Sequence, residues 1–248
     1  MMQTHEQILE LVAARRRQPA TRRGFLLGSA KLAGGGALAL AFAGTPIART
    51  LREATAQTTF ANDLDVFNYA LTLEHLEATF YRDGLDQFSA ADFADAGYDD
   101  SVYEFLGLIR DHEIEHVDTI AAVISGAGGT PVQEAEYDFG YNDVDGFVSV
   151  AQALENTGVD AYTGAAQFIA DPDLLTAALT IHGVEARHAS YLNNLVGDSP
   201  FPDAFDAPQT PDEILAIAGP FIVSGGGTTG TTTMPSTGTG PGRRPKGR

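Results

Sequence analysis

Two pairs of residues, each a glutamate followed three positions later by a histidine, carry the most readily recognised chemistry in this sequence. The first pair is Glu113 and His116, and the second is Glu185 and His188. Residues three apart on a helix lie one turn apart on the same face, so both side chains of a pair can bind one ion. Carboxylate and imidazole groups without sulfur suit iron or manganese, and zinc is also compatible with them.

A second repeat accompanies these pairs. Glu74 is followed seven residues later by Tyr81, and Glu155 is followed seven residues later by Tyr162. Each Glu-x6-Tyr segment precedes one Glu-x-x-His segment, so the pattern predicts two tandem helix hairpins. Each hairpin would supply one single glutamate and one Glu/His pair.

Apolar residues recur at helical spacing in four windows, which predict four long helices and an all-α fold. The windows span residues 64–81, 102–124, 147–169 and 174–196. Gly158 and Gly164 stand inside the third window. Glycine weakens a helix, so we expect close packing against a neighbouring segment at these two positions.

Local signals place the ends of these helices. Asp63 is the expected N-cap of the first helix, and Asp171 followed by Pro172 begins the fourth. The Gly-rich connection over residues 126–143 is long enough to cross along a helix bundle. A short fifth helix is expected after Thr210.

Glutamates and histidines interrupt the apolar stripes of these helices. A charged group on a core face costs several kcal/mol unless it is paired or bound to a cation. Several such groups around one bundle axis therefore need a common partner, and a pair of metal ions would supply it. The candidate ligands are Glu74, Glu113, His116, Glu155, Glu185 and His188.

Three stretches, residues 73–81, 154–162 and 182–188, resemble the ferritin-like domain proteins that bacteria and archaea export, which are similar to plant desiccation-related proteins. The resemblance covers residues 60–223. It implies a ferritin-like four-helix bundle with a short C-terminal fifth helix, placed here over residues 57–223. It also implies a dinuclear site that holds two iron or manganese ions.

The resemblance implies a role for each polar side chain of the site. Glu74 and Glu155 would bridge or chelate the ions, and the two Glu/His pairs would complete the coordination. Tyr81 and Tyr162 would donate hydrogen bonds to the coordinating carboxylates, or serve as plain core aromatics. His182, three residues before the second pair, would be a substitute ligand or would hydrogen-bond to a ligand.

Two alternatives stay open. Glu77 could replace Glu74, although it lies near the edge of the apolar stripe and breaks the repeat. Residues 112–116 also spell His-Glu-x-x-His, in which both histidines would bind zinc and Glu113 would activate water, as in a zinc protease. Against this, His112 points to the edge of the stripe, and the ligands of the second hairpin would have no role.

The N-terminal segment carries an export signature. Residues 21–26, Thr-Arg-Arg-Gly-Phe-Leu, resemble the twin-arginine signal, and a mildly apolar stretch follows to about residue 43. We expect residues 1–56 to be this signal, with the twin-arginine translocase as a partner during export. The protein would then be extracellular, at the cell surface or in a periplasm-like space, and membrane-anchored if the signal is not cleaved.

Acidic residues dominate the chain. The formal net charge is −18, and between residues 58 and 240 thirty acids face three arginines and no lysine. This balance excludes general nucleic-acid binding and indicates adaptation to high salt, where screening limits self-repulsion. Cysteine is absent, which excludes disulfides, thiolate-bound metals and thiol nucleophiles. Residues 224–248 predict a flexible Gly/Thr-rich tail with a basic tip.

These features favour a metal-dependent oxidase that acts on Fe(II) or peroxide, with O₂ or peroxide as reactant, in protection against stress. A non-enzymatic alternative is a metal-stabilised surface protein that aids survival in drying or salt. A cage for iron storage is less favoured because the signal and the tail indicate an exported unit. A homo-oligomer is compatible with the sequence.

Overall fold

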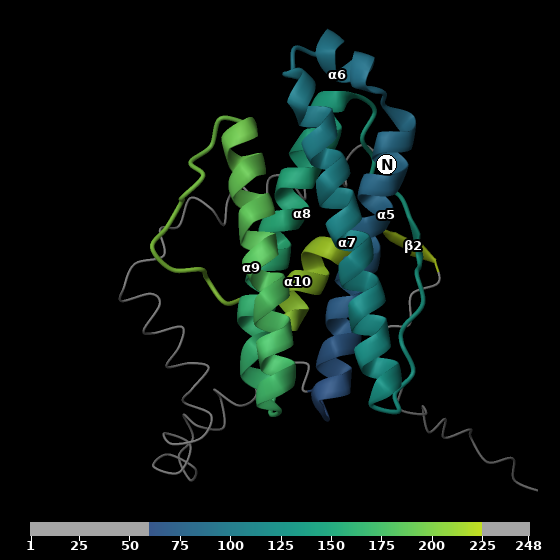
Figure 1. Cartoon of the computed structure of the whole chain (residues 1–248), viewed down its shortest axis with the longest axis vertical. Coiled ribbons are helices and arrows are strands. Elements are labelled where there is room, and N and C mark those ends of the chain that lie inside the picture. Colours follow the sequence, from purple (N-terminus) through teal and green to yellow (C-terminus); the bar gives the residue numbers. More distant parts are fainter. Residues whose placement is uncertain (1–59, 225–248) are drawn as a thin grey trace, which may run out of the picture.

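The computed structural model describes residues 60–224, so the expected signal and nearly all of the expected tail lie outside the described residues. Four long helices dominate the fold (Figure 1), and the all-α fold is confirmed. They are α5 (Asp63–Gln87), α7 (Asp100–Gly126), α8 (Val144–Ala165) and α9 (Pro172–Leu195). The shorter elements are α6 (Ala90–Asp95), η1 (Ala166–Phe168), α10 (Pro211–Ala218), η2 (Gly219–Phe221), β1 (Glu136–Tyr137) and β2 (Ile222–Ser224).

The long helices pack as two hairpins, α5 with α7 and α8 with α9, and α5 also contacts α8. The connection between the hairpins runs along the side of the bundle, as expected for a crossover (Figure 1). It carries the short strand β1, which the sequence did not predict. This strand pairs antiparallel with β2, and the backbone N–H of Asp138 donates to the carbonyl of Phe221 at 2.9 Å. The pairing fixes the end of the domain to the crossover.

Helix capping follows the sequence in two places and departs from it in one. Asp171 caps α9 with Pro172 in its first turn, and Thr210 begins α10 with a capping box, as expected. The predicted cap of α5 was wrong, because Asn62 accepts the hydrogen bonds of that helix end. Asp63 instead accepts from the backbone N–H groups before α9, at 2.9 Å each. It therefore ties the start of α5 to the start of α9.

The apolar core is split into two clusters, and the ligand candidates on α7 and α9 lie between them along the chain, level with those on α5 and α8. The larger cluster is rich in aromatic rings, among them Phe80 and Phe147, which stack with centroids 4.7 Å apart. The smaller cluster contains Leu71, Ile120 and Ile181. Because both clusters are apolar, they shield the polar layer between them from water along the bundle axis.

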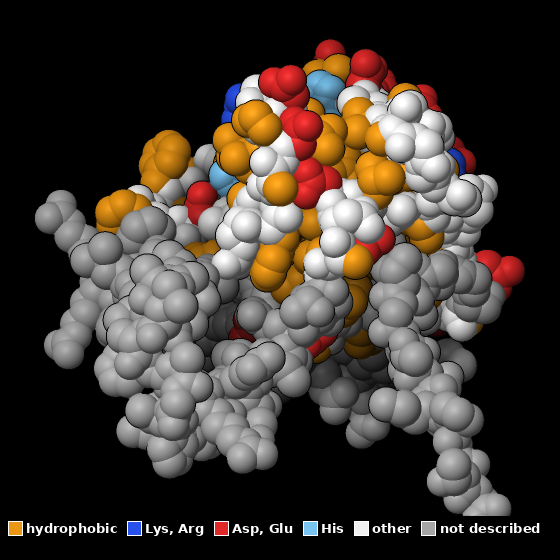
Figure 2. Space-filling model, turned by 90° about the horizontal axis from the view of Figure 1, so that it is seen from below, with side chains coloured by type: hydrophobic (Ala, Val, Ile, Leu, Met, Phe, Trp, Pro, Cys, Tyr) orange, Lys and Arg blue, Asp and Glu red, His pale blue; other side chains and the backbone are white. Residues whose placement is uncertain are grey.

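On the face seen in Figure 2, red acidic side chains are spread among apolar ones and few blue side chains are visible. No helix among residues 60–224 is long and apolar enough to cross a bilayer.

Close packing at a glycine generates the first prediction. A Cβ added to Gly164 of α8 would lie 1.8 Å from the backbone oxygen of Gln209, whereas one added to Gly107 of α7 would meet nothing within 4 Å. Gly164→Ala should therefore destabilise the fold by about 1–3 kcal/mol through overpacking. Gly107→Ala is the matched control and should stabilise by up to about 1 kcal/mol through helix propensity. Denaturant unfolding measures both, and equal effects would contradict the packing.

Candidate metal centre

All six predicted ligands come together inside the bundle, and all six are buried. Helix α5 supplies one glutamate, α8 supplies another, and α7 and α9 supply one Glu/His pair each. Their side chains form two overlapping groups, in each of which one ligand atom per residue lies within 4.8 Å of the others.

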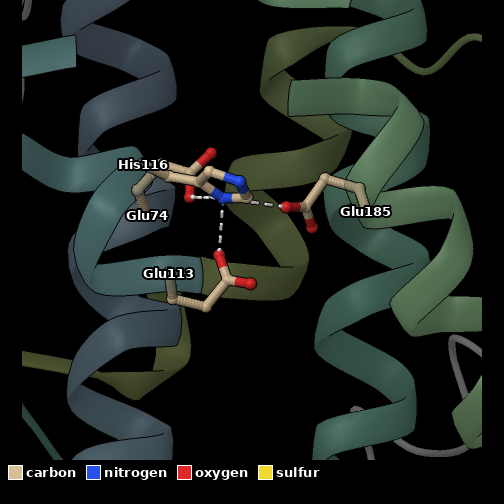
Figure 3. Close-up of side chains that lie close together, drawn as sticks. All are labelled: Glu74, Glu113, His116 and Glu185. Carbon is tan, nitrogen blue, oxygen red and sulfur yellow. Dashed lines mark hydrogen bonds and ion pairs between the residues drawn. The ribbon is translucent and has the colours of Figure 1, made fainter. Parts of the chain in front are cut away.

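The first group surrounds His116 (Figure 3). Its Nδ1 lies 3.0 Å from Oε2 of Glu113, 3.2 Å from Oε2 of Glu74 and 3.2 Å from Oε1 of Glu185. One imidazole nitrogen carries at most one proton, so it can donate to only one of three carboxylates at a time. A cation among these four side chains would satisfy all of them together.

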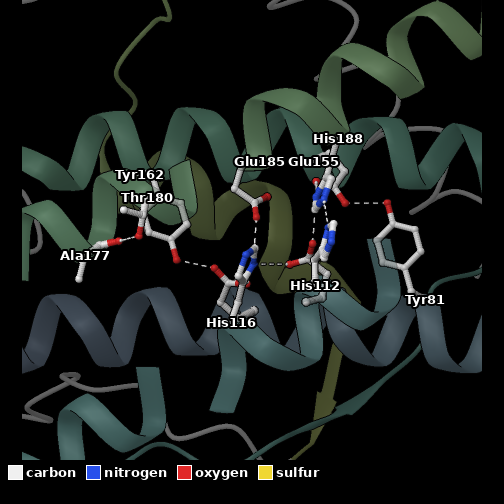
Figure 4. Close-up of polar contacts among 11 residues, drawn as sticks. Tyr81, His112, His116, Glu155, Tyr162, Ala177, Thr180, Glu185 and His188 are labelled. Atoms are coloured by element: carbon white, nitrogen blue, oxygen red, sulfur yellow. Dashed lines mark hydrogen bonds and ion pairs between the residues drawn. The ribbon is translucent and has the colours of Figure 1, made fainter. Parts of the chain in front are cut away.

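The second group surrounds His188 (Figure 4). Its Nδ1 lies 3.0 Å from Oε1 of Glu113 and 3.2 Å from Oε2 of Glu155, and Glu185 completes the group. Like the first group, it combines three carboxylates with one imidazole. Each group is thus a four-ligand set of the kind that iron and manganese accept.

Glu113 and Glu185 belong to both groups. Glu113 presents Oε2 to His116 and Oε1 to His188, so its two oxygens serve different groups. Glu74 and Glu155, which were expected to bridge or chelate, each lie in one group only. That placement fits a terminal ligand that chelates one ion rather than a bridge. Oε2 of Glu185 is buried with no hydrogen-bond partner in the described part of the chain, and Oε1 of Glu185 and Oε1 of Glu113 have only an ion-pair contact with a histidine nitrogen. Such atoms fit a bound cation.

The two predicted tyrosines contact carboxylates of the site, and they do so crosswise. Tyr81 of α5 donates its hydroxyl hydrogen bond to Oε1 of Glu155 on α8, at 2.7 Å. Tyr162 of α8 donates to Oε1 of Glu74 on α5 (Figure 4). Each tyrosine therefore holds the single glutamate of the other hairpin, which leaves the second oxygen of that carboxylate facing its histidine.

His182 departs from its expected role, whereas His112 lies outside both ligand groups, as its position at the edge of the stripe predicted. The structure does not bring His182 to the cluster, because its ring is turned toward α8, where Nε2 lies 3.0 Å from Oγ1 of Thr163, and it is also 3.7 Å from Asp206. His112 belongs to neither group, contrary to the zinc-protease pattern. Its Nδ1 lies 2.9 Å from Nε2 of His188, with the rings stacked (Figure 4). It thus orients the outer nitrogen of a candidate ligand.

Glu77 is the residue whose position the sequence reasoning missed. It was an alternative to Glu74, yet the structure buries both, and Glu77 is only 4% exposed. The spacing of Glu74 and Glu77 equals that of each Glu/His pair, which was a usable signal for a second inward side chain. The position of Glu77 near the edge of the apolar stripe argued against an inward side chain.

An open groove reaches the site from the side between α7 and α9. It encloses about 460 Å³, and its walls are largely apolar. The outer edges of His116 and His188 line it together with His112. A small reactant could therefore approach the cluster without disturbing the apolar core. The remaining lining residues are Phe105, Leu108, Ile109, Glu115, Val184, Arg187 and Tyr191.

Without a cation, the pKa values of the buried glutamates and histidines are shifted strongly from their usual values. Burial, followed by the charge of Glu155, raises the pKa of Glu113 to about 7, and burial raises the pKa of Glu185 well above its usual range. Burial alone would lower the pKa of both candidate histidines. Contacts with the carboxylates, Glu113 first, outweigh it and raise the pKa of His116 to about 12 and that of His188 to about 9. The metal-free site therefore retains protons at neutral pH.

These shifts predict how the stability of the metal-free protein depends on pH. Groups whose pKa is raised on folding stabilise the fold at low pH and lose that contribution as pH rises through the folded value. The free energy of unfolding should therefore fall by a few kcal/mol between pH 5 and pH 9, as Glu113 and then His188 lose protons. Denaturant unfolding in molar salt, with chelator present, measures this.

Glu113→Gln is the control for that prediction. It removes one titrating group and a carboxylate that holds protons on both histidines, so the fall between pH 5 and pH 9 should become shallower. Parallel curves for the two proteins would mean that the dependence comes from the acidic surface instead.

Comparison with known proteins agrees with this geometry. The chain is 26% identical over 164 residues to Protein rds1 of Schizosaccharomyces pombe, a match that covers 65% of this chain and 39% of that protein. The chain thus spans about two fifths of that relative. Residues 62–198 match the ferritin-like domain family, a range that contains every ligand candidate and both tyrosines. With four helices that converge on buried carboxylates and histidines, the chain belongs to the ferritin-like domain family.

Proposed function

We propose that this chain holds a pair of iron or manganese ions and uses them to oxidise Fe(II) or to remove peroxide, as an exported protein that protects against stress. The observation that carries the proposal is the sharing of Glu113 and Glu185 between two four-ligand groups. Two shared carboxylates support two adjacent metal positions, as a dinuclear centre requires.

The donor set supports the choice of metal. Four carboxylates and two imidazoles, in a chain without cysteine, favour iron or manganese, and zinc could compete by mismetallation. The four carboxylates carry the charge that balances two divalent ions. When bound, such a pair supplies one electron from each ion for the reduction of O₂ or peroxide.

Residues of the chain would hold this centre in place. Tyr81 and Tyr162 fix the terminal carboxylates by donating to them, and His112 fixes the ring of His188. The groove between α7 and α9 would admit O₂, peroxide or Fe(II) to the histidine side. The apolar clusters on either side would keep bulk water away.

Metal stoichiometry tests the dinuclear centre. Protein folded in its native host and purified in molar salt should contain about two iron or manganese ions per chain, one for each four-ligand group. Glu113→Ala should lose both, since that carboxylate serves both groups, whereas Glu74→Ala and Glu155→Ala should each lose one. Elemental analysis per chain measures this. No metal in the wild type, or equal loss in all three variants, would contradict the arrangement.

Turnover tests the reaction. Metal-loaded wild type should oxidise Fe(II) and consume peroxide, and Glu113→Ala should reduce either rate by at least about a hundredfold. Glu104→Gln, an exposed acid on α7, is the matched control and should keep the wild-type rate. Stopped-flow absorbance follows both substrates. Two bound ions without turnover would favour the alternative, a metal-stabilised protein without enzymatic activity.

A further inference from the structure

The two hairpins repeat the site with one substitution that the repeat does not explain. Glu74 and Tyr81 correspond to Glu155 and Tyr162, eighty-one positions further on. By the same offset Glu77 corresponds to Gly158. The first hairpin therefore carries a carboxylate at this position, three residues after its glutamate, and the second hairpin has no side chain at the matching position.

Gly158 and Glu77 fit each other in space. A Cβ at position 158 would lie 3.2 Å from Oε1 of Glu77 and 2.9 Å from Oε2 of Glu185. The missing side chain thus leaves room for two carboxylates to reach the same point of α8. The difference between Glu77 and Gly158 makes the two halves of the centre unequal. It adds one acid on the side formed by Glu155 and Glu185.

Glu77 has no partner of opposite charge. It is nearly fully buried, and no hydrogen bond or ion pair joins it to any residue in the described range 60–224. The charges that act on it most are those of Glu185, Glu155, Glu113 and Glu74, the glutamates of the two groups. A buried acid among like charges destabilises the fold unless a cation is present.

The count of charges indicates which cation the Glu77 carboxylate would favour. The four glutamates of the two groups already neutralise two divalent ions. A fifth carboxylate exceeds that need, and it becomes favourable when the ions carry more positive charge. Ligand charge is one of the means by which protein sites set their affinity for ions.

We propose that Glu77 is a fifth carboxylate of the centre, seated against Gly158, and that it makes the centre selective for trivalent over divalent ions. The inference rests on the proposed metal centre and concerns which charge state that centre favours. Its consequence for an oxidase is direct, because a site that prefers the trivalent state favours loss of electrons by the ions bound in it.

The test uses the full chain with two probe ions of different charge, Tb³⁺ and Mn²⁺, in anaerobic molar salt, where no oxidant is present to change the charge of Mn²⁺. The chain has no tryptophan, so tyrosine excitation reports Tb³⁺ binding, and Mn²⁺ binding is followed by electron paramagnetic resonance. Glu77→Gln keeps the shape and removes the charge. It should weaken Tb³⁺ binding by about tenfold and Mn²⁺ binding by about fivefold, so that the Tb³⁺/Mn²⁺ affinity ratio falls by about twofold, since the lost attraction scales with ion charge.

Two further readouts separate this role from a structural one. The metal-free Glu77→Gln protein should melt at a higher temperature than wild type, because the cost of burying an acid among other carboxylates is gone. Glu77→Asp keeps the charge and should keep a Tb³⁺/Mn²⁺ affinity ratio nearer to wild type. Glu104→Gln, which removes an exposed acid of α7, should change neither affinity.

Each other result overturns the inference. Equal loss of both ions with a lower melting temperature in Glu77→Gln would make Glu77 a structural residue. Unchanged affinities for both ions would remove it from the centre while leaving the centre intact. A wild type that binds neither Mn²⁺ nor Tb³⁺ would refute the metal centre itself, and the selectivity with it.

Discussion

Mutual repulsion of buried carboxylates is the constraint on which the rest of this structure depends. Glu74, Glu113, Glu155 and Glu185 are almost completely buried within one layer of the bundle, and each raises the energy of the others. Two histidine nitrogens cannot satisfy them, because each has one proton to share among several oxygens. Without a cation the layer must retain protons, and with one it can release them. The fold therefore links the protonation of its centre to metal binding.

The architecture holds this unfavourable layer in place by apolar packing and hydrogen bonds around it. Apolar clusters above and below the layer stabilise the bundle, so the centre itself need not. The tyrosines tie the hairpins to each other, because Tyr81 and Tyr162 each contact the glutamate of the opposite hairpin. The crossover strand adds a further tie where β1 meets β2. Together these contacts preorganise oxygens that would otherwise move apart.

The sequence predicted what depends on helical periodicity. Spacing of three places Glu113 and His116 on one face whatever the neighbours do, and spacing of seven likewise places Glu74 and Tyr81. It could not predict that Glu113 and Glu185 would be the shared pair, since that depends on how far the hairpins are shifted along each other and on side-chain rotamers. The role expected for His182 depended on a rotamer in the same way. It lies three residues before Glu185, yet its ring points toward Thr163 and not toward the cluster. The pairing of β1 with β2 joins segments that are distant in sequence, and periodicity does not reveal it. The cap at Asn62 depends on a single side-chain rotamer, which periodicity does not reveal either.

The departures from internal symmetry carry the most specific information about this centre. A duplicated hairpin alone would give two equivalent positions, yet Glu77 is matched by Gly158, and His112 is matched by Val184 when the Glu/His pairs are superposed. Valine cannot hydrogen-bond to a ring nitrogen, so within residues 60–224 His188 gains such support from His112 and His116 gains none from Val184. Both differences act on the half of the centre that contains Glu155 and His188. One position would thus combine an oriented imidazole with additional negative charge, and the other would have neither. Two ions bound here would differ in affinity and in the ease with which they lose an electron, although the repeat that built the site made its ligands alike.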